Sequence, residues 1–407
     1  MIGMLQIGEI SPAPAIMHEQ PCCRLWRNAV SLPLAKVDPD GLIEYSVVFN
    51  DRSLNHMSLR FQDIMQDISR RLRAVYQAEA AVLVPGGGSF AMEAVARQFA
   101  GGRNAMVIRN GWFSYRWTQI FEMGGIPSST TVIKARPIEP GIDAAFAPPP
   151  LDDVLERIRA EQPAVVFMPH VETSAGILLP DRYIADIADA VHAAGGLVVL
   201  DCVASGALWI DMQTLGVDVL ISAPQKGWSA SPCAGLVMLS ARACTELENT
   251  QSSSFACDLR KWRQIMAAYE NGGHAYHGTL PTDALAVFRK ALIETMDAGL
   301  EVVRARQIEL GTGVRELLRR HGYKSVAAGG FEASSVVVCH TVDDGLHTGR
   351  RFAEVGLQSA AGVPLMCDEP AGFKTFRLGL FGLEKLQHVD RSLGHLERAL
   401  RAIEEGR

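Results

Sequence analysis

The sequence lacks the cysteine pattern of a disulfide-stabilised or zinc-binding protein. Its eight cysteines are spread along 407 residues, and no two of them have the CxxC spacing. The 11 histidines form no HExxH motif, which is a common zinc-binding arrangement. We therefore expect neither a disulfide framework nor a metal ion.

The sequence also lacks long apolar runs and basic stripes. No stretch of about 18 consecutive apolar residues occurs, and residues 1–20 carry no basic segment ahead of an apolar one, as a secretory signal would. The net charge of -6 and the pI near 6.0 come from mixed charges, which is not the electrostatic pattern of a nucleic-acid-binding protein. We expect a cytoplasmic protein that acts on small molecules, with no membrane or nucleic-acid partner.

Short apolar runs alternate with helical patterns between about residues 80 and 240. The runs are rich in branched residues and do not alternate strictly with polar ones, which is typical of strands buried on both faces. They are residues 81–84, 105–108, 131–133, 164–168, 197–200, 218–221 and 234–239. This order predicts an α/β fold with a large, doubly wound, mostly parallel sheet.

The last third of the chain has a different pattern. One long helical run extends from Thr282 to about Arg320, and strands are predicted near 335–340 and 375–380. Together they predict a smaller C-terminal α+β domain. We expect three parts in the chain: an N-terminal arm (1–40), a large domain (41–300) and a small domain (301–407).

A lysine and an aspartate follow two of the predicted strands. Asp201 ends the apolar run Leu197-Val-Val-Leu, and Lys226 lies in Ser222-Ala-Pro-Gln-Lys-Gly-Trp228 after a later run. Pyridoxal phosphate (PLP) chemistry requires an amine that forms a Schiff base with the aldehyde, and a carboxylate that keeps the ring nitrogen protonated. The two residues indicate a PLP enzyme.

The surrounding residues resemble one family, the class V aminotransferases. Asp201-Cys-Val-Ala-Ser205, followed by Ser222-Ala-Pro-Gln-Lys226, is similar to their D-x-V-A-S…S-x-x-Q-K block, especially in the alanine/serine–glyoxylate branch. The resemblance implies the PLP-dependent transferase fold of type I, with Lys226 and Asp201 as catalytic residues. It also implies that Val203 packs on the cofactor ring and that Gln225 lies near the phosphate.

A glycine-rich turn resembles the phosphate loop of the same family. Val84-Pro-Gly-Gly-Gly-Ser-Phe-Ala-Met-Glu93 lies between a predicted strand and a predicted helix. Backbone N–H groups and the helix dipole can bind a phosphate at such a turn. The resemblance implies that the residues at the cofactor phosphate are Gly88, Ser89 and Phe90.

Two more motifs follow the next strands. Asn110-Gly-Trp-Phe-Ser-Tyr-Arg116 is similar to the family's turn whose aromatic residue lies on the pyridine ring, which implies Phe113, with Trp112 as the alternative. Pro169-His-Val-Glu-Thr-Ser-Ala-Gly176 is similar to its H-x-E-(T/S)-(S/T)-x-G motif. By that resemblance the hydroxyls of Thr173 and Ser174 bind the cofactor, while His170 and Glu172 support the site.

The resemblance continues beyond the predicted sheet. Tyr276-His-Gly-Thr-Leu-Pro281 is similar to the segment by which a partner subunit completes the phosphate site, which implies a homodimer with Tyr276 and Thr279 at a shared site. Arg377, on a predicted strand, matches the arginine that binds the substrate carboxylate. Its planar fork suits a carboxylate because it donates two parallel hydrogen bonds.

Transfer of an amino group from a small L-amino acid to a 2-oxo acid, such as glyoxylate or pyruvate, is the function that the resemblance implies. The N-terminal glycine-proline stretch of the glyoxylate branch is absent, so the substrates stay open. One alternative is a PLP-dependent lyase or desulfurase that uses Lys226 and Cys367. Another is a PLP-binding regulatory protein without turnover. The role of Trp228, close to the lysine, is also open.

Overall fold

The computed structural model of the chain describes residues 37–406. The chain divides into two compact units, one ending at Leu54 and the other running from Asn55. The second unit holds every predicted site residue. The predicted N-terminal arm lies almost wholly outside the described residues, and the domain boundaries at residues 40 and 300 stay predictions. Within residues 37–406, no helix combines the length and the apolar character needed to cross a membrane.

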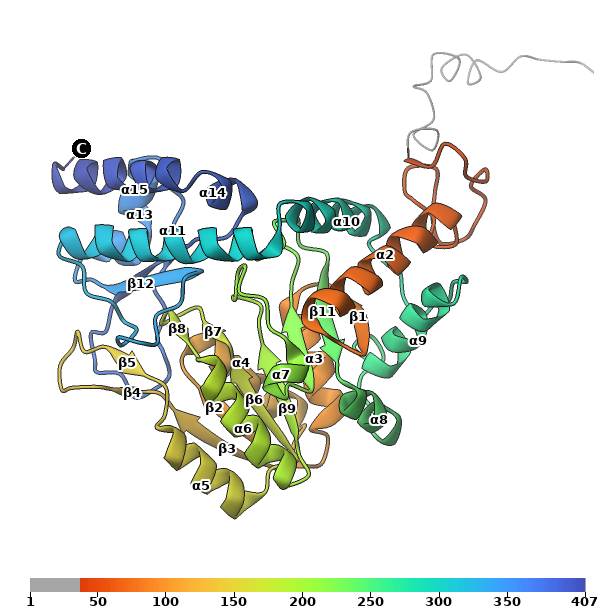
Figure 1. Cartoon of the computed structure of the whole chain (residues 1–407), viewed down its shortest axis with the longest axis horizontal. Helices are drawn as coiled ribbons and strands as arrows, with labels where there is room; N and C mark the ends of the chain where they lie inside the picture. Colours follow the sequence, from red (N-terminus) through yellow and green to blue (C-terminus); the bar gives the residue numbers. More distant parts are fainter. Residues whose placement is uncertain (1–36, 407) are drawn as a thin grey trace, which may run out of the picture. The chain divides into compact units, whose positions relative to one another are not determined.

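A seven-stranded sheet forms the centre of the second unit (Figure 1). All its strands are parallel except β11, which pairs antiparallel with both of its neighbours. This arrangement confirms the predicted α/β fold with a mostly parallel sheet. In spatial order the strands are β1 (Ala80–Pro85), β11 (Ala234–Leu239), β10 (Val219–Ser222), β9 (Leu197–Asp201), β6 (Val165–Pro169), β2 (Asn104–Arg109) and β3 (Ser129–Lys134).

Helices cover both faces of this sheet. The chain crosses the sheet in one direction through α3 (Gly88–Phe99) and α4 (Trp112–Gly124), and in the other through α5 (Leu151–Glu161) and α6 (Asp181–Ala193). Because parallel crossovers are right-handed, opposite directions put the two pairs on opposite faces. Accordingly α3 contacts α4, and α5 contacts α6. The central strands are therefore buried on both sides, which explains their continuous apolar sequences.

The remaining elements of the large sheet region lie around its edges. The helices α2 and α9 contact β1, and α10 contacts α2. These elements are α2 (Leu59–Tyr76), α7 (Met212–Leu215), α8 (Ala241–Asn249), α9 (Leu259–Glu270), α10 (Thr282–Asp297), β4 (Arg136–Pro137), β5 (Phe146–Ala147), β7 (Val171–Glu172) and β8 (Ile177–Leu178).

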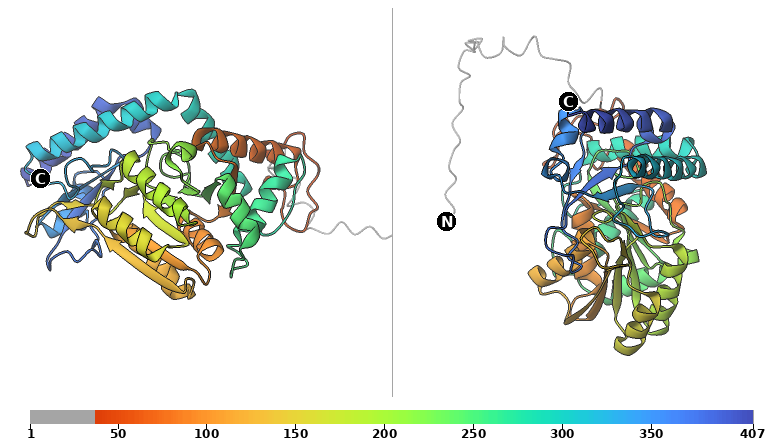
Figure 2. Two further views of the ribbon diagram at one scale, coloured as in Figure 1. Left: turned by 60° about the horizontal axis from the view of Figure 1, so that its bottom comes forward. Right: turned by 90° about the vertical axis from the view of Figure 1, so that its left-hand side faces the viewer.

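A three-stranded antiparallel sheet forms the C-terminal part, in the order β12 (Val336–His340), β14 (Thr375–Gly379) and β13 (Ala360–Ala361). Helices α11 (Leu300–Arg320) and α15 (Val389–Glu404) lie side by side next to it (Figures 1 and 2). Their apolar faces share one core with the inner face of the strands. The short helices of this part are α12 (Asp344–His347), α13 (Arg350–Glu354) and α14 (Leu383–Gln387).

The predicted single helical run from Thr282 to Arg320 is wrong in one respect. The structure divides it into α10 and α11 at Ala298 and Gly299. Gly299 has a φ of 85°, a value that glycine adopts without strain and that a helix cannot contain. The apolar pattern continues across the break, which is why the sequence indicates one run.

The loops that follow β9 and β10 touch through two glycines. A Cβ on Gly227 would collide with the carbonyl oxygen of Gly206. Gly206 itself has a φ of +64°, and its own Cβ would lie 2.6 Å from Oε1 of Gln307. Only glycine fits at either position. This contact fixes the position of the backbone next to Lys226 relative to the loop that begins with Asp201.

We predict that Gly227→Ala lowers the free energy of unfolding by about 1–3 kcal/mol, because an overpacked methyl group forces the two loops apart. Chemical denaturation of the purified variant measures this change. Gly329→Ala is the matched control, since a Cβ there meets nothing within 4 Å. Equal stability of the two variants would show that the loops can separate without cost.

Candidate active site

The predicted motifs converge at one edge of the large sheet. The glycine-rich turn follows β1, the Asn110 turn follows β2, the His170 motif follows β6, Asp201 ends β9, and the Lys226 loop follows β10. These strands are parallel, so their carboxyl ends share one edge, where open α/β sheets bind ligands. The topology thus brings together residues from five separate segments.

Lys226 is a half-buried amine among aromatic and cationic groups. Its Nζ lies 4.7 Å from the ring centroid of Phe381. Burial lowers the pKa of Lys226 below its usual range, and the positive charge of Arg377 lowers it further, while Asp201 opposes the shift. A lowered pKa increases the fraction of uncharged amine, which is the nucleophilic form.

Asp201 is a carboxylate in an environment that disfavours its charge. Burial raises its pKa to about 6, and the negative charge of Glu172 contributes to the rise. The backbone N–H of Val203 donates to Oδ1 at 2.9 Å and opposes it. A carboxylate in such a site gains free energy when a cation comes beside it. Asp201 is therefore suited to hold a protonated ring nitrogen.

The glycine-rich turn leaves the start of α3 open to an anion. Its N-cap is Gly87, which provides no side chain to cap the first backbone N–H groups. A Cβ on Gly88 would lie 2.9 Å from Cγ2 of Val203, so the turn packs directly on the Asp201 loop. Ser89 Oγ accepts a hydrogen bond from Nη1 of Arg116 at 2.9 Å. Phe90 is half exposed at this turn.

Phe113 lies between two guanidinium groups. Cζ of Arg116 is 5.2 Å from the centroid of its ring, and Cζ of Arg377 is 5.4 Å away. Both distances are within the range of a cation–π contact. The sequence motif includes Arg116, but sequence reasoning assigns it no role. The structure places it against both the predicted phosphate turn and the predicted stacking residue.

Glu172 is a fully buried carboxylate that holds the turn before α4. It accepts hydrogen bonds from the backbone N–H groups of Phe113 and Ser114 at 3.1 and 2.9 Å. It also accepts from the hydroxyl groups of Ser114 and Ser174 and from the backbone N–H of Ser174. A buried carboxylate that accepts several charge-assisted hydrogen bonds holds its donor groups in a fixed geometry. Glu172 therefore supports Phe113, in agreement with its predicted supporting position.

Ser174 belongs to the same network. Its Oγ donates to Oε1 of Glu172 at 2.7 Å and accepts from the backbone N–H of Trp112 at 2.8 Å. A Cβ on Gly111 would overlap this hydroxyl, so the turn requires glycine. The predicted cofactor contact of Ser174 stays a prediction, with one acceptor position left to make it. Thr173, in the turn between β7 and β8, is partly exposed.

His170 supports the Asp201 loop through hydrogen bonds. Its Nδ1 lies 2.7 Å from Oγ of Ser205, and its backbone N–H donates to the carbonyl of Asp201. Burial lowers the pKa of His170 to about 3, so the ring is neutral at physiological pH. A neutral, hydrogen-bonded imidazole fits the supporting role that the sequence indicates.

Two side chains at this edge carry buried polar atoms without a partner. Among residues 37–406, Oε1 of Gln225 and both side-chain polar atoms of Asn110 make no hydrogen bond. Unsatisfied buried polar atoms are costly, so a ligand that pairs with them stabilises the site. Together with the uncapped α3 turn, they fit a polar, phosphorylated cofactor.

Arg377 is placed on β14 with its end groups available. Its Nε donates to the carbonyl of Ala361 at 2.8 Å, which orients the guanidinium. Within the described residues its two terminal nitrogens donate no hydrogen bond. Burial lowers its pKa, and Glu172 opposes the shift. This geometry leaves a two-nitrogen fork for a carboxylate.

Tyr276 and Thr279 do not join the other site residues within this chain. The Tyr276 hydroxyl lies 3.2 Å from Oγ1 of Thr279, and 55% of the tyrosine is exposed. In the described part of the chain, neither hydroxyl bonds to the glycine-rich turn. Their predicted role needs a second subunit, and it stays a prediction.

Trp228 belongs to the core. It is fully buried, stacks on Trp209 with ring centroids 4.3 Å apart and meets Tyr76 edge-on. This aromatic cluster packs beneath the Lys226 loop. The structure therefore gives Trp228 a packing role.

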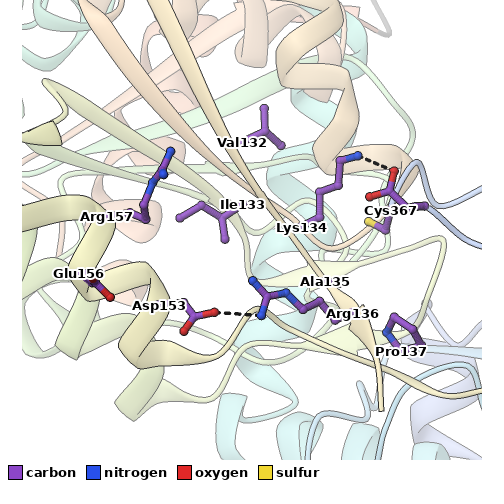
Figure 3. A pocket seen from close by; sticks show the side chains of 11 residues that line it. Val132, Ile133, Lys134, Ala135, Arg136, Pro137, Asp153, Glu156, Arg157 and Cys367 are labelled. Atoms are coloured by element: carbon purple, nitrogen blue, oxygen red, sulfur yellow. Dashed lines mark hydrogen bonds and ion pairs between the residues drawn. The ribbon is translucent and has the colours of Figure 1, made fainter. Parts of the chain in front are cut away.

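A surface pocket of about 600 Å³ lies elsewhere, beside β3 (Figure 3). Its charged lining is balanced, and it includes the ion pairs Lys134–Asp368 and Arg136–Asp153. Of the residues considered in the sequence it contains only Cys367, whose Sγ donates to the carbonyl of Arg109 at 3.4 Å. Burial raises the pKa of Cys367 to about 12, which keeps the thiol protonated.

The fold and this edge define a class: α/β enzymes with a lysine and an aspartate at the carboxyl ends of adjacent parallel strands. The aminotransferase class-V family model matches residues 43–339. The chain belongs to the aminotransferase class-V family, a family of PLP-dependent enzymes, as the sequence motifs predict.

Individual relatives agree with this assignment. The 2-aminoethylphosphonate–pyruvate transaminase of Burkholderia thailandensis is 30% identical over 80% of this chain and 84% of the relative. Alanine–glyoxylate aminotransferase 1 of Saccharomyces cerevisiae is 26% identical over 61% of this chain and 66% of the relative, slightly under two thirds of its length. The crystal structure of alanine–glyoxylate aminotransferase from Nostoc sp. has a TM-score of 0.69 at 23% identity, and covers 85% of this chain and 89% of that one. It confirms the fold.

We predict that Asp201→Asn changes the pH dependence of the cofactor-free protein. The pKa of Asp201 rises from 3.8 to about 6 on folding, so its contribution to stability is complete below about pH 4 and is lost as the pH rises through 6. The variant should melt at a higher temperature than wild type at pH 7.5, and the difference should shrink towards pH 4. Calorimetry of both proteins measures this.

Asp189→Asn is the control for that experiment, because Asp189 is exposed on α6. It should follow the wild-type profile. If Asp201→Asn also follows the wild-type profile, Asp201 is not held in an unfavourable environment.

Proposed function

We propose that the protein is a PLP-dependent aminotransferase that moves an amino group from a small L-amino acid to a 2-oxo acid such as glyoxylate or pyruvate. The observation that carries the proposal is the placement of Lys226 and Asp201 on adjacent strand ends, with Arg377 close enough to lower the pKa of the lysine. The named relatives pair their amino donors with glyoxylate or pyruvate. A cytoplasmic location stays a prediction from the sequence.

Residues of this chain would hold the cofactor from several sides. The α3 turn, through Gly88, Ser89 and Phe90, and the side-chain NH2 group of Gln225 would bind its phosphate, while the unpartnered Oε1 of Gln225 is left to accept from another donor. By the family resemblance, Phe113 and Val203 would pack on opposite faces of the ring; in this structure Val203 lies against Gly88 of the turn. Asp201 would hold the ring nitrogen, and Thr173 and Ser174 the remaining polar edge.

When bound, PLP supplies an aldehyde for the amine and a protonated ring that withdraws electrons from the α-carbon. Lys226 would be the base: its Nζ would take the α-proton of the amino acid and hold it until it is given back later in the transfer. Burial and the charge of Arg377 lower its pKa, which increases the fraction of the amine that can accept a proton. Asp201 keeps the ring nitrogen charged.

The substrate would lie between two aromatic rings. Arg377 takes the carboxylate through its terminal nitrogens, which its Nε bond to Ala361 orients. The ring of Phe113 lies 5.4 Å from Cζ of Arg377, and the ring of Phe381 lies 4.7 Å from Nζ of Lys226. Two fixed rings near the carboxylate site favour a small side chain, in agreement with the proposed substrates.

Desulfurase chemistry has less support from this structure. It needs an accessible thiolate near the amine, whereas Cys367 is buried and its thiol stays protonated. Its Sγ bonds to a backbone carbonyl, away from the lysine. The alternative that uses Cys367 is therefore the weaker one.

The proposed functional unit is a homodimer. Residues 42–47 of the first unit expose four large apolar side chains, Leu42, Ile43, Tyr45 and Val47. In the second unit Phe255 is 78% exposed, and its ring contacts the ring of His277, next to Tyr276, at a tilt of 42°. Exposed apolar groups of this kind indicate an interface. A second copy of the chain would cover them and receive Tyr276 and Thr279 at its phosphate site.

An amino-acid screen tests the proposed activity. The PLP-loaded protein, mixed with single L-amino acids, should convert its cofactor absorbance to that of the pyridoxamine form and release the matching oxo acid. Lys226→Ala should bind PLP but lose conversion by at least about 10³-fold, because the substitution removes the proposed base. Borohydride should fix PLP covalently to wild type and not to the variant.

Lys290→Ala is the control, since that lysine is exposed on α10. Release of pyruvate with sulfide or ammonia would make the protein a lyase. No change with any amino acid would leave it a binding protein. Borohydride fixation to Lys226→Ala would place the reactive lysine elsewhere.

The homodimer predicts a link between assembly and cofactor affinity. Tyr276→Phe combined with Thr279→Ala should weaken PLP binding about tenfold or more without unfolding the chain, because two hydroxyls are lost from the partner's phosphate site. Removal of PLP should also weaken the dimer, since a ligand that binds the assembled site stabilises the assembly. Sedimentation of loaded and cofactor-free protein across a dilution series measures both effects. A monomer that keeps full PLP affinity would rule out the shared site.

A further inference from the structure

Gln307 is a buried polar side chain that the proposed chemistry does not use. It lies on α11, is fully buried and makes three hydrogen bonds. Its Oε1 accepts from the N–H of Ala207 at 3.4 Å, and its Nε2 donates to the carbonyls of Ser334 at 3.0 Å and Leu380 at 3.2 Å. One side chain thus joins three segments that are far apart in the sequence.

The helix that carries Gln307 is built to approach these segments closely. Gly311 lies one turn further along α11, and a Cβ there would meet the backbone of Ser334 at 2.6 Å. The absence of a side chain lets the α11 backbone lie against the start of β12. This approach brings the Gln307 amide within reach of the Ser334 carbonyl.

Each bonded segment leads directly to a proposed site residue. Ala207 belongs to the loop that begins with Asp201 and, through Gly206, touches the Gly227 backbone beside Lys226. Leu380 follows Arg377 on the same chain segment and precedes Phe381, whose ring faces Lys226. Gln307 therefore bridges the lysine–aspartate side of the site and the carboxylate-binding side.

A second side chain makes the same connection. Oγ of Ser335 donates to the carbonyl of Ala204 at 2.6 Å, and its own carbonyl accepts from the N–H of Leu380 at 2.9 Å. The two residues form a hydrogen-bonded seam, from Ala204 and Ala207 across to Leu380. Neither side chain of the seam is charged. The seam therefore holds these segments at a fixed distance and orientation and does not compete with Arg377 for the substrate carboxylate.

We propose that Gln307 is a positioning residue that sets the distance between Arg377 and Lys226, and with it the grip on the substrate carboxylate. The inference rests on the proposed function in so far as Arg377 takes that carboxylate. Loss of the seam frees the segment with Arg377 and Phe381 while the α3 turn stays in place. The carboxylate is then held loosely, and the cofactor is held as before.

Gln307→Met tests this role, because methionine keeps the volume and removes all three hydrogen bonds. In the PLP-loaded protein, KM for the amino acid and for the oxo acid should both rise roughly tenfold, with kcat changed less and PLP affinity unchanged. In an Arg377→Lys background the same substitution should add little, because the fork it positions is gone.

Two further measurements do not depend on turnover. Gln307→Met should bind propionate, a carboxylate without an amino group, more weakly by calorimetry. Backbone amides of residues 378–383 should exchange hydrogen faster, since the carbonyl of Leu380 loses the hydrogen bond from Gln307 that helps to hold this segment. Gln98→Met is the matched control: Gln98 is equally buried and bonds to Thr250, at the end of α3 remote from the site. It should change neither measurement.

The outcomes separate the two proposals. If no amino acid is converted by wild type, the proposed function fails, while propionate binding and hydrogen exchange still decide the role of Gln307. Unchanged propionate affinity and unchanged exchange in a folded Gln307→Met would overturn the inference, as would equal effects in Gln98→Met. If Gln307→Met does not fold, Ser335→Ala should give the same changes with smaller size, and their absence there would be equally decisive.

Discussion

The close contact between Gly206 and Gly227 is the constraint on which the rest of the site depends. Parallel strands bring their carboxyl ends to one edge, but they fix the following loops only loosely. Here the two loops touch backbone to backbone, where any side chain would collide. The amine of Lys226 and the carboxylate of Asp201 therefore keep one separation. Each changes the other's pKa because of that separation.

Electrostatics and burial act together around this contact. Burial disfavours the charge of both Lys226 and Asp201. Arg377 further disfavours the charge of Lys226 and Glu172 that of Asp201, while Arg116 and the attraction between the lysine and the aspartate offset only part of this. Glu172 is itself committed to the turn before α4 through its hydrogen bonds. The charged groups at this edge are thus only partly stabilised by the protein itself. A ligand with a cationic ring and an anionic phosphate would stabilise them further when it binds.

Much of this architecture could be predicted from the sequence. The apolar runs at 164–168 and 197–200 identify β6 and β9 because both are buried on both faces and carry no polar alternation. Lys226, Asp201 and Arg377 could be proposed as site residues because each belongs to a motif that resembles one family, and the structure brings them to one edge of the sheet. The break at Gly299 could not, since an apolar pattern continues across it, and a single glycine is compatible with a helix until its φ is known.

The supporting residues could not be identified either. Gln307 lies inside an amphipathic helix, with no motif around it, and its three partners are distant in the sequence. Arg116 belongs to a motif, but its contact with Ser89 depends on how two helices start next to each other. Such residues act through tertiary contacts, which a pattern along the chain does not record.

The reversed strand β11 also affects the lysine. Because β11 runs antiparallel to β10, the loop that carries Lys226 leaves and re-enters the sheet at the same edge. Its far end is tied to the glycine-rich turn, where the N–H of Gly86 donates to the carbonyl of Cys233 at 3.1 Å. Both ends of the loop that carries Lys226 are therefore held in place. The amine can rotate about its own side-chain bonds while both ends of the loop are held, so proton transfer by Lys226, the proposed base, would depend on the reach of one side chain.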